Sequence, residues 1–200
     1  VSAADIAAND YQLMVSRYAR SQLTDAVDAA LRAGEVVRLE ELVEFIRPVP
    51  ISAADAKVNN PAQALEVGVA ELPEFGYIRQ PQKRVQLASL RNELQPLDIL
   101  IAVKGSVGKV GIVPPNVDAP WVAGQSCLVL RLNQEAKRRL HSPHSLLLYL
   151  RSALGRACLS RITSGAAVPL IQLRELRKLA VLVPSMQEQE GADQVFNELV

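Results

Sequence analysis

Apolar residues recur at helical spacing near the start of the chain. In residues 21–33 four apolar positions fall on one side of a helix and Gly34 follows as a stop, so this segment predicts a helix. A second short helix is predicted over residues 38–46, whose apolar residues also share one side, with Pro48 beyond its end. Residues 52–61 are mostly polar and predict a loop.

The pattern then changes to short runs of β-branched residues, interrupted by Gly, Pro and Asn, between residues 67 and 132. Such runs predict strands, and the clearest are LDILIAV at residues 97–103 and WVAGQSCLVLRL at residues 121–132. We expect a twisted, mainly antiparallel sheet here, with helices before and after it. The predicted fold class is therefore α+β.

Helical signals return after the predicted sheet. Ser142 and Pro143 form an N-cap and first-turn pair for the apolar segment SLLLYLRSAL at residues 145–154. Residues 173–179 predict a short helix, and the AVLVP that follows predicts a strand.

A last helix is predicted from residue 185, because Ser185 and Glu188 have the spacing of a capping box. Its apolar positions, Met186, Val195 and Leu199, are too few to bury a stable face alone. We therefore expect the beginning of a longer helix, a coiled-coil element that packs on a partner.

Composition is that of an ordinary globular protein, with 49% hydrophobic and 22% charged residues. No apolar run approaches the roughly 18 residues of a membrane helix, and the first residues lack the basic and apolar blocks of a secretory leader. Cys127 and Cys158 stand apart in apolar surroundings, which indicates buried, reduced thiols. We expect a cytoplasmic protein of one domain with appendages and no membrane partner.

Charge is unevenly distributed along the chain. Residues 1–74 carry six basic and twelve acidic side chains, whereas residues 131–180 carry ten basic and two acidic ones. A basic block in a nearly neutral protein favours a polyanionic partner. The alternative is a set of solvated helix faces whose charges meet no partner.

The glycine-rich stretch VKGSVGKVGIV, residues 103–113, resembles a phosphate-binding loop at first sight. A Walker-type loop needs glycine five residues before the Gly-Lys pair and Ser or Thr after it, where this chain has Val103 and Val110. The stretch therefore predicts a β-hairpin whose tip exposes Lys104 and Lys109. Such a turn contacts the phosphates of a nucleic-acid backbone, or it only connects two strands.

Other arrangements that would carry chemistry are incomplete. Gly124-Gln125-Ser126-Cys127 lacks the second glycine of a nucleophile elbow. The set of Cys127, His141, His144 and Cys158 lacks the close spacing of a structural zinc site. The Asn-Pro-Pro-Tyr signature of adenine methyltransferases does not occur. We expect neither a catalytic site nor a cofactor.

Several of these pieces together resemble the target recognition domain of type I restriction–modification specificity subunits. The block QPLDILIAVKGSVGKVGIV, residues 95–113, is similar to a central block of that family. The segment TSGAAVPLIQLRELRKLAVLVPSMQEQEGA, residues 163–192, is similar to its closing block, and VVRLEELVEFIRPVPI, residues 36–51, to its opening.

Upstream, residues 9–18 resemble the segment that ends the partner adenine-specific DNA methyltransferase. The resemblance implies three parts. They are a helical linker over residues 1–35, a target recognition domain over residues 36–184, and the start of a long helix over residues 185–200.

The resemblance implies sequence-specific recognition of double-stranded DNA, while a separate methyltransferase domain or subunit transfers the methyl group. Basic side chains would contact phosphates and polar side chains would read base edges. The expected phosphate contacts are Lys83, Arg84, Lys104, Lys109 and Arg161. The expected base readers are Arg79, Gln80, Gln82, Gln125, Thr163 and Ser164.

Further partners implied are the restriction subunit and a second copy joined through the C-terminal helix. The alternative function is a protein–protein docking module of the methyltransferase complex with no DNA binding of its own.

Overall fold

A four-stranded antiparallel sheet lies at the centre of the computed structural model, which describes residues 3, 7, 22–51, 58–165 and 167–198. Its strand order is β2-β8-β5-β6. The strands are β2 (Val43–Ile46), β8 (Cys127–Leu132), β5 (Ile99–Ala102) and β6 (Val110–Ile112). Every residue of β5 is buried, because Ile99 and Ile101 face one hydrophobic cluster and Leu100 and Ala102 face another. The central sheet is therefore covered on both faces.

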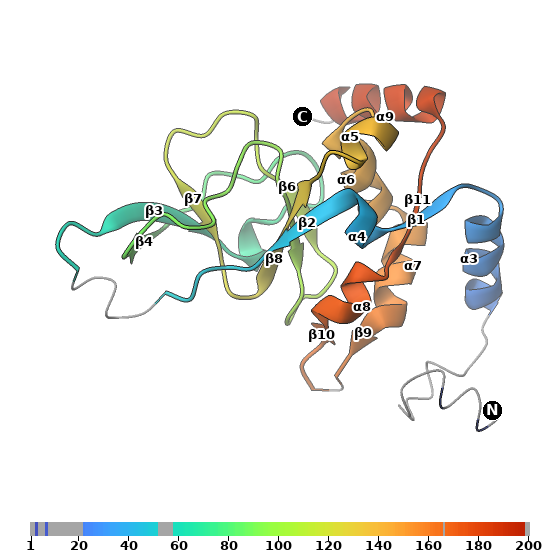
Figure 1. Ribbon diagram of the computed structural model, residues 1–200, viewed down its shortest axis with the longest axis horizontal. Coiled ribbons are helices and arrows are strands. Elements are labelled where there is room, and N and C mark those ends of the chain that lie inside the picture. Colours follow the sequence, from blue (N-terminus) through green and yellow to red (C-terminus); the bar gives the residue numbers. More distant parts are fainter. Residues whose placement is uncertain (1–2, 4–6, 8–21, 52–57, 166, 199–200) are drawn as a thin grey trace.

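The second sheet covers one of those faces and extends away from the helices (Figure 1). Its order is β4-β3-β7, with β3 (Ala62–Val67) antiparallel to β4 (Lys83–Leu87) and parallel to β7 (Trp121–Ala123). A 3-10 helix, η2 (Val69–Glu71), follows β3. The predicted sheet over residues 67–132 is thus two sheets, and both recruit strands from before residue 67.

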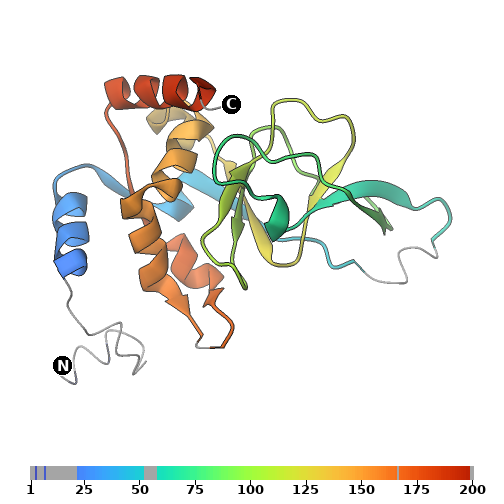
Figure 2. The same cartoon turned by 180° about the vertical axis from the view of Figure 1, so that it is seen from behind.

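Helices cover the other face of the central sheet (Figures 1 and 2). The α+β prediction is confirmed. The helices, in chain order, are α3 (Gln22–Arg32), α4 (Leu39–Leu42), α5 (Ala136–Arg139), α6 (Pro143–Arg151), α7 (Ala153–Ile162), α8 (Leu173–Arg177) and α9 (Met186–Glu198). Two small antiparallel pairs join this layer, β1 (Val36–Arg38) with β11 (Ala180–Leu182), and β9 (Thr163–Ser164) with β10 (Leu170–Ile171).

The helix predicted over residues 38–46 is wrong in its second half. Only Leu39–Leu42 is helical, and the next four residues form β2, in which Val43 pairs with Leu132 and Ile46 with Val129 of β8. A pairing with a strand more than 80 residues away overrides the local helical spacing. The predicted helix at residues 21–33 is confirmed.

The predicted N-cap of α6 is confirmed, since the Ser142 hydroxyl accepts a hydrogen bond from the backbone N–H of His144. The apolar segment that follows is not one helix, because it breaks at Ser152, whose hydroxyl caps α7 by accepting from the N–H of Gly155. The short helix α8 and the strand β11 lie where the sequence predicts them.

The capping box of α9 is also confirmed, because the Glu188 carboxylate accepts from the backbone N–H of Ser185 at 2.8 Å. The expectation that this helix lacks a buried face of its own is wrong. Phe196 and Gln189 are each 1% exposed and face the domain, whereas Met186 and Val195 are exposed. Leu199, the predicted methyltransferase-like segment at residues 9–18 and most of the loop predicted at residues 52–61 lie outside the described residues.

Candidate nucleic-acid interface

The glycine-rich stretch is a β-hairpin, as predicted. β5 and β6 pair antiparallel with Ile101 opposite Val110. The N–H of Gly108 donates to the carbonyl of Ala102 at 3.0 Å, and Gly105 and Gly108 take positive φ angles of 79° and 85°. These φ values are in the left-handed region that only glycine enters freely, so the glycines make the tight turn possible. Lys104 and Lys109 are exposed on it.

This turn is joined to the β9–β10 hairpin. The N–H of Gly105 donates to the carbonyl of Pro169 at 3.0 Å, and the N–H of Ile171 donates to the carbonyl of Val103 at 2.9 Å. Lys104 forms a β-bridge with Leu170, and Leu170 in turn pairs with Ser164. Two segments that are about 60 residues apart in sequence thus lie side by side, with Lys104 on one edge of β10 and Thr163 and Ser164 of β9 on the other.

Gln125 lies on the same side of the domain. It belongs to the turn between β7 and β8, where the carbonyl of Ser126 accepts from the N–H of Val103 at 2.8 Å. A cavity of about 270 Å³ beside it is lined by Arg47 together with Val103 and Ile171. Arg47 is exposed and was missed in the sequence, where it is a single cation after an apolar run. We call the surface of Arg47, Lys104, Gln125, Thr163 and Ser164 the lower edge, because the strands β9 and β10 lie at the bottom of Figure 1.

The polar side chains of the lower edge already have partners within the chain. The Gln125 amide donates to the carbonyl of Val49 at 2.7 Å, and the Thr163 hydroxyl donates to the carbonyl of Leu159 at 2.8 Å. The Ser164 hydroxyl donates to the carbonyl of Leu170 at 3.3 Å. These bonds fix the orientation of the three groups and leave the amide and hydroxyl oxygens as hydrogen-bond acceptors.

The other predicted residues fall into a second group on and before β4. Lys83 and Arg84 lie on β4, while Arg79, Gln80 and Gln82 are exposed in the segment that leads to it. Lys83 forms an ion pair with Glu66 at 2.8 Å. The β3–β4 ribbon extends away from the helices, so this group does not join the lower edge (Figures 1 and 2).

Arg161 is held by the helical layer. Its guanidinium donates to the carboxylate of Asp28 on α3 at 2.8 Å, and both side chains are partly exposed. A guanidinium with a carboxylate partner is partly neutralised, so the structure gives no support to Arg161 as a phosphate contact.

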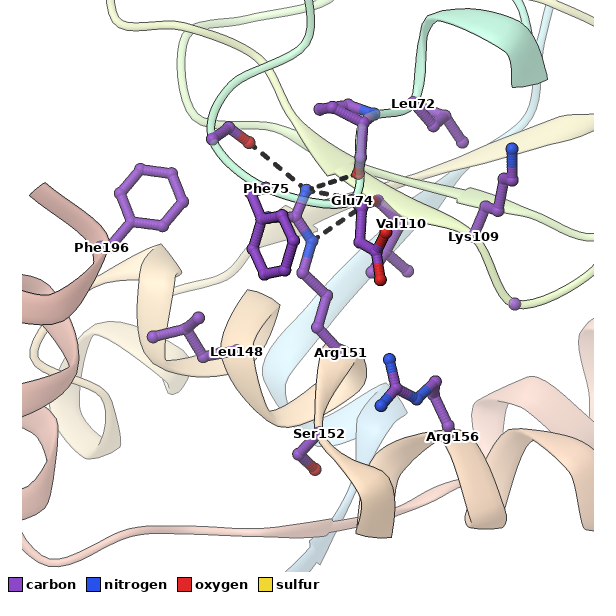
Figure 3. Close-up of a pocket in the computed structure, with 13 residues that line it drawn as sticks. Leu72, Glu74, Phe75, Lys109, Val110, Leu148, Arg151, Ser152, Arg156 and Phe196 are labelled. Carbon is purple, nitrogen blue, oxygen red and sulfur yellow. Dashed lines mark hydrogen bonds between the residues drawn. The ribbon is translucent and has the colours of Figure 1, made fainter. Parts of the chain in front are cut away.

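A cavity of about 650 Å³ lies between α6, α7 and the segment after η2 (Figure 3). Arg151 spans it and donates to the carbonyls of Pro73, Gly76 and Val110 at 3.0 to 3.3 Å. Burial lowers the pKa of Arg151, and the nearby charge of Glu74 offsets only part of this effect. The bonds to three carbonyls show that Arg151 holds the two layers together.

The two cysteines and two histidines do not form one cluster, although both histidines lie near the Asp193 carboxylate. Cys127 lies in the cluster between the two sheets and Cys158 in the cluster under the helices. Burial, followed by the charges of Glu71 and Glu66, raises the pKa of the Cys127 thiol to about 12, which leaves it protonated and unreactive at neutral pH. The His144 ring is hydrogen-bonded on both sides, through Nε2 to the Tyr77 hydroxyl at 3.3 Å and through Nδ1 to the Asp193 carboxylate at 3.1 Å. Because Asp193 belongs to α9, these bonds hold α9 on the domain.

None of the helices in the described residues has both the length and the apolar character of a membrane span.

Comparison with known proteins gives one consistent result. Residues 35–193 match the family model described as the type I restriction modification DNA specificity domain. Over 116 residues the chain is 25% identical to the type I restriction enzyme EcoBI specificity subunit of Escherichia coli, which is 58% of this chain and 23% of that protein.

Two solved structures share the fold. The S subunit of a type I restriction–modification system from M. genitalium superposes with a TM-score of 0.55 and 17% identity, over 82% of this chain and 39% of that one. The HsdS subunit from Thermoanaerobacter tengcongensis gives a TM-score of 0.57 and 16% identity, over 98% of this chain and 48% of that one. The chain thus spans half or less of the length of these relatives. Because the family model covers most of its residues, the chain belongs to the type I restriction–modification DNA specificity domain family.

Proposed function

We propose that this chain recognises a DNA sequence on behalf of a type I restriction–modification DNA methyltransferase. The observation that carries the proposal is the match of residues 35–193 to the DNA specificity domain. The lower edge supports it, because the cations Lys104 and Arg47 lie on the same surface as the polar residues Gln125, Thr163 and Ser164. Recognition of a duplex requires cations that position the protein on the phosphates. It also requires polar groups whose free acceptors can form hydrogen bonds with base edges.

The chain itself carries no chemistry in this proposal. A separate methyltransferase domain or subunit binds the methyl donor, and the restriction subunit joins the same assembly. The unreactive Cys127 thiol and the structural bonds of His144 and Arg151 agree with a role limited to recognition and assembly.

A second candidate is a docking module that contacts only the protein partners. It is favoured by the exposed side of α9, where Met186 is 61% and Val195 49% exposed. DNA binding by the full-length protein that contains this chain separates the two functions.

The experiment is a titration of the full-length protein with labelled duplexes drawn from a randomised library, at two salt concentrations. Sequence recognition predicts that one sequence is enriched and binds at least about 1,000-fold more tightly than random duplex. A docking module predicts equal, weak binding to all duplexes while the methyltransferase is still bound in a pull-down assay.

A further inference from the structure

The β3–β4 ribbon carries polar side chains in a regular arrangement on one face. In this antiparallel pair Gln63 lies opposite Gln86, and Leu65 lies opposite Arg84. Side chains alternate between the two faces of a strand, so Gln63, Arg84 and Gln86 share a face. We call these three residues the amide row.

The opposite face of the ribbon is closed by the core. Ala64, Val85 and Leu87 form a buried cluster with Val122 of β7, and Ile51 packs against it. A shift of the pairing by one residue would expose this cluster to solvent, so the register is fixed. The amide row therefore cannot turn inward.

The amide row itself is exposed and free. All three side chains are exposed, and no hydrogen bond or ion pair joins them to the rest of the described chain. Closer to the central sheet the same face is apolar, since Leu65 packs beside Val67 and Trp121. Figure 2 shows the ribbon extending away from the rest of the domain.

These residue types match the chemistry of base edges. The major groove admits a two-stranded β-ribbon, Gln pairs with the N6 and N7 of adenine through two hydrogen bonds, and Arg pairs likewise with the O6 and N7 of guanine. Same-face residues on one strand are about 6.8 Å apart. This distance equals about two steps of 3.4 Å along a DNA strand, so Arg84 and Gln86 would meet bases two steps apart.

We propose that the β3–β4 ribbon enters the major groove of the target duplex and that Gln63, Arg84 and Gln86 read bases there. This inference rests on the proposed function and names the groups that give it specificity. Arg84, expected from the sequence to contact phosphate, becomes a base reader. Gln63 and Gln86 are new, and the lower edge is left to position the duplex.

The test starts from the sequence that the full-length wild-type protein selects from a randomised duplex library. Gln63→Ala, Arg84→Ala and Gln86→Ala should each weaken binding to that sequence roughly 5- to 150-fold, with affinity for random duplex unchanged for the two glutamine variants. A repeated selection with each variant should show a relaxed preference at one base pair. Gln134→Ala and Arg138→Ala, exposed positions before and on α5, are the matched controls and should select the wild-type sequence.

Arg84→Lys separates base from phosphate contact, because lysine keeps the charge and loses the two-pronged geometry. Under the proposal it loses selectivity as Arg84→Ala does, whereas a phosphate contact would keep both affinity and selectivity. Wild-type selection by all amide-row variants would overturn this inference and leave the proposed function intact. If the wild-type protein selects no sequence at all, the proposed function fails with it.

Discussion

The side-chain amide of Gln189 donates a hydrogen bond to the backbone carbonyl of Arg139 at 3.0 Å, and so joins α9 to the end of α5. The same amide donates to the carbonyl of Pro184 at 2.8 Å, and its oxygen accepts from the N–H of His141. All three bonds are sheltered, since Gln189 is 1% exposed. Because its hydrogen bonds are made to Arg139, Pro184 and His141, the Gln189 side chain fixes the position of the first turn of α9 on the domain.

We predict that Gln189→Ala loosens α9. The substitution leaves the sheltered N–H of His141 and the carbonyls of Arg139 and Pro184 without these partners. Each unsatisfied group costs about 1–3 kcal/mol. Hydrogen exchange at the α9 amides should become faster while exchange in the central sheet changes less. Gln187→Ala, at an exposed position on the same helix, is the control, and equal exchange in the two variants would contradict the role of Gln189.

A second prediction concerns the break between α6 and α7. A Cβ atom on Gly155 would lie 2.0 Å from the carbonyl oxygen of Tyr149 and 2.9 Å from the Cα of Leu150, both backbone atoms. Gly155→Ala should therefore destabilise the domain by at least about 1–3 kcal/mol, because the two helices must separate. Urea unfolding followed by the fluorescence of Trp121, the one tryptophan of the chain, measures the change.

Gly191→Ala in α9 is the matched comparison. Apart from its chain neighbours and the backbone of its own helix, no atom of the described residues lies within 4 Å of the added Cβ atom. The same substitution should here stabilise α9 by about 0.5–1 kcal/mol. Destabilisation of similar size by both variants would show that packing at Gly155 is not the cause.

The sequence predicted the starts of α6 and α9 and the hairpin because those signals are local. Ser142, Ser185 with Glu188, and the glycines of the KGSVGK turn act on residues within four positions of themselves. The helix over residues 38–46 failed because Val43–Ile46 pairs with β8, and no local pattern contains that information. Phe196 was overlooked as the anchor of α9 because its partners, Tyr77 and His144, come from distant segments.

The sequence predicted only those parts of the candidate site that depend on local signals. The sequence placed Lys104 on a turn, but only the bridge to Leu170 brings it to the same small sheet as Thr163 and Ser164. It could not foresee that Asp28 pairs with Arg161 across 133 residues. Gln63 was passed over because the strand that gives it a face and a partner was expected to begin at residue 67.

The Cys127 thiol gives a prediction about pH. Its pKa is about 12 in the folded chain against the ordinary value of 9.0, because burial disfavours the thiolate. The folded state therefore keeps a proton that the unfolded state loses above pH 9. Stability should fall as the pH rises from about 9 towards 12, with a slope of up to about 1.4 kcal/mol per pH unit.

Urea unfolding at pH 8 and pH 10 tests this expectation. The loss of stability between the two pH values should be smaller in Cys127→Ala than in the wild-type protein by about 1 kcal/mol. The small cavity left by the substitution lowers stability at both pH values and cancels in this difference. Equal losses in the two proteins would mean that the thiol ionises as easily in the folded chain as in the unfolded one.

The last prediction concerns the KGSVGK turn, with Lys104 on the lower edge and Lys109 at the other end of the turn. Replacement of both lysines by alanine should weaken binding to the selected sequence and to random duplex by about the same factor, because phosphate contacts carry no sequence information. The slope of log K against log salt should decrease by roughly two units, since each phosphate contact contributes about 0.9. The control is Lys137→Ala with Arg138→Ala on α5, which removes the same charge from exposed positions in the helical layer (Figure 1). If the turn variant binds with the affinity and salt dependence of this control, the turn is only a connection between β5 and β6, and the cations that hold the duplex must lie elsewhere on the domain.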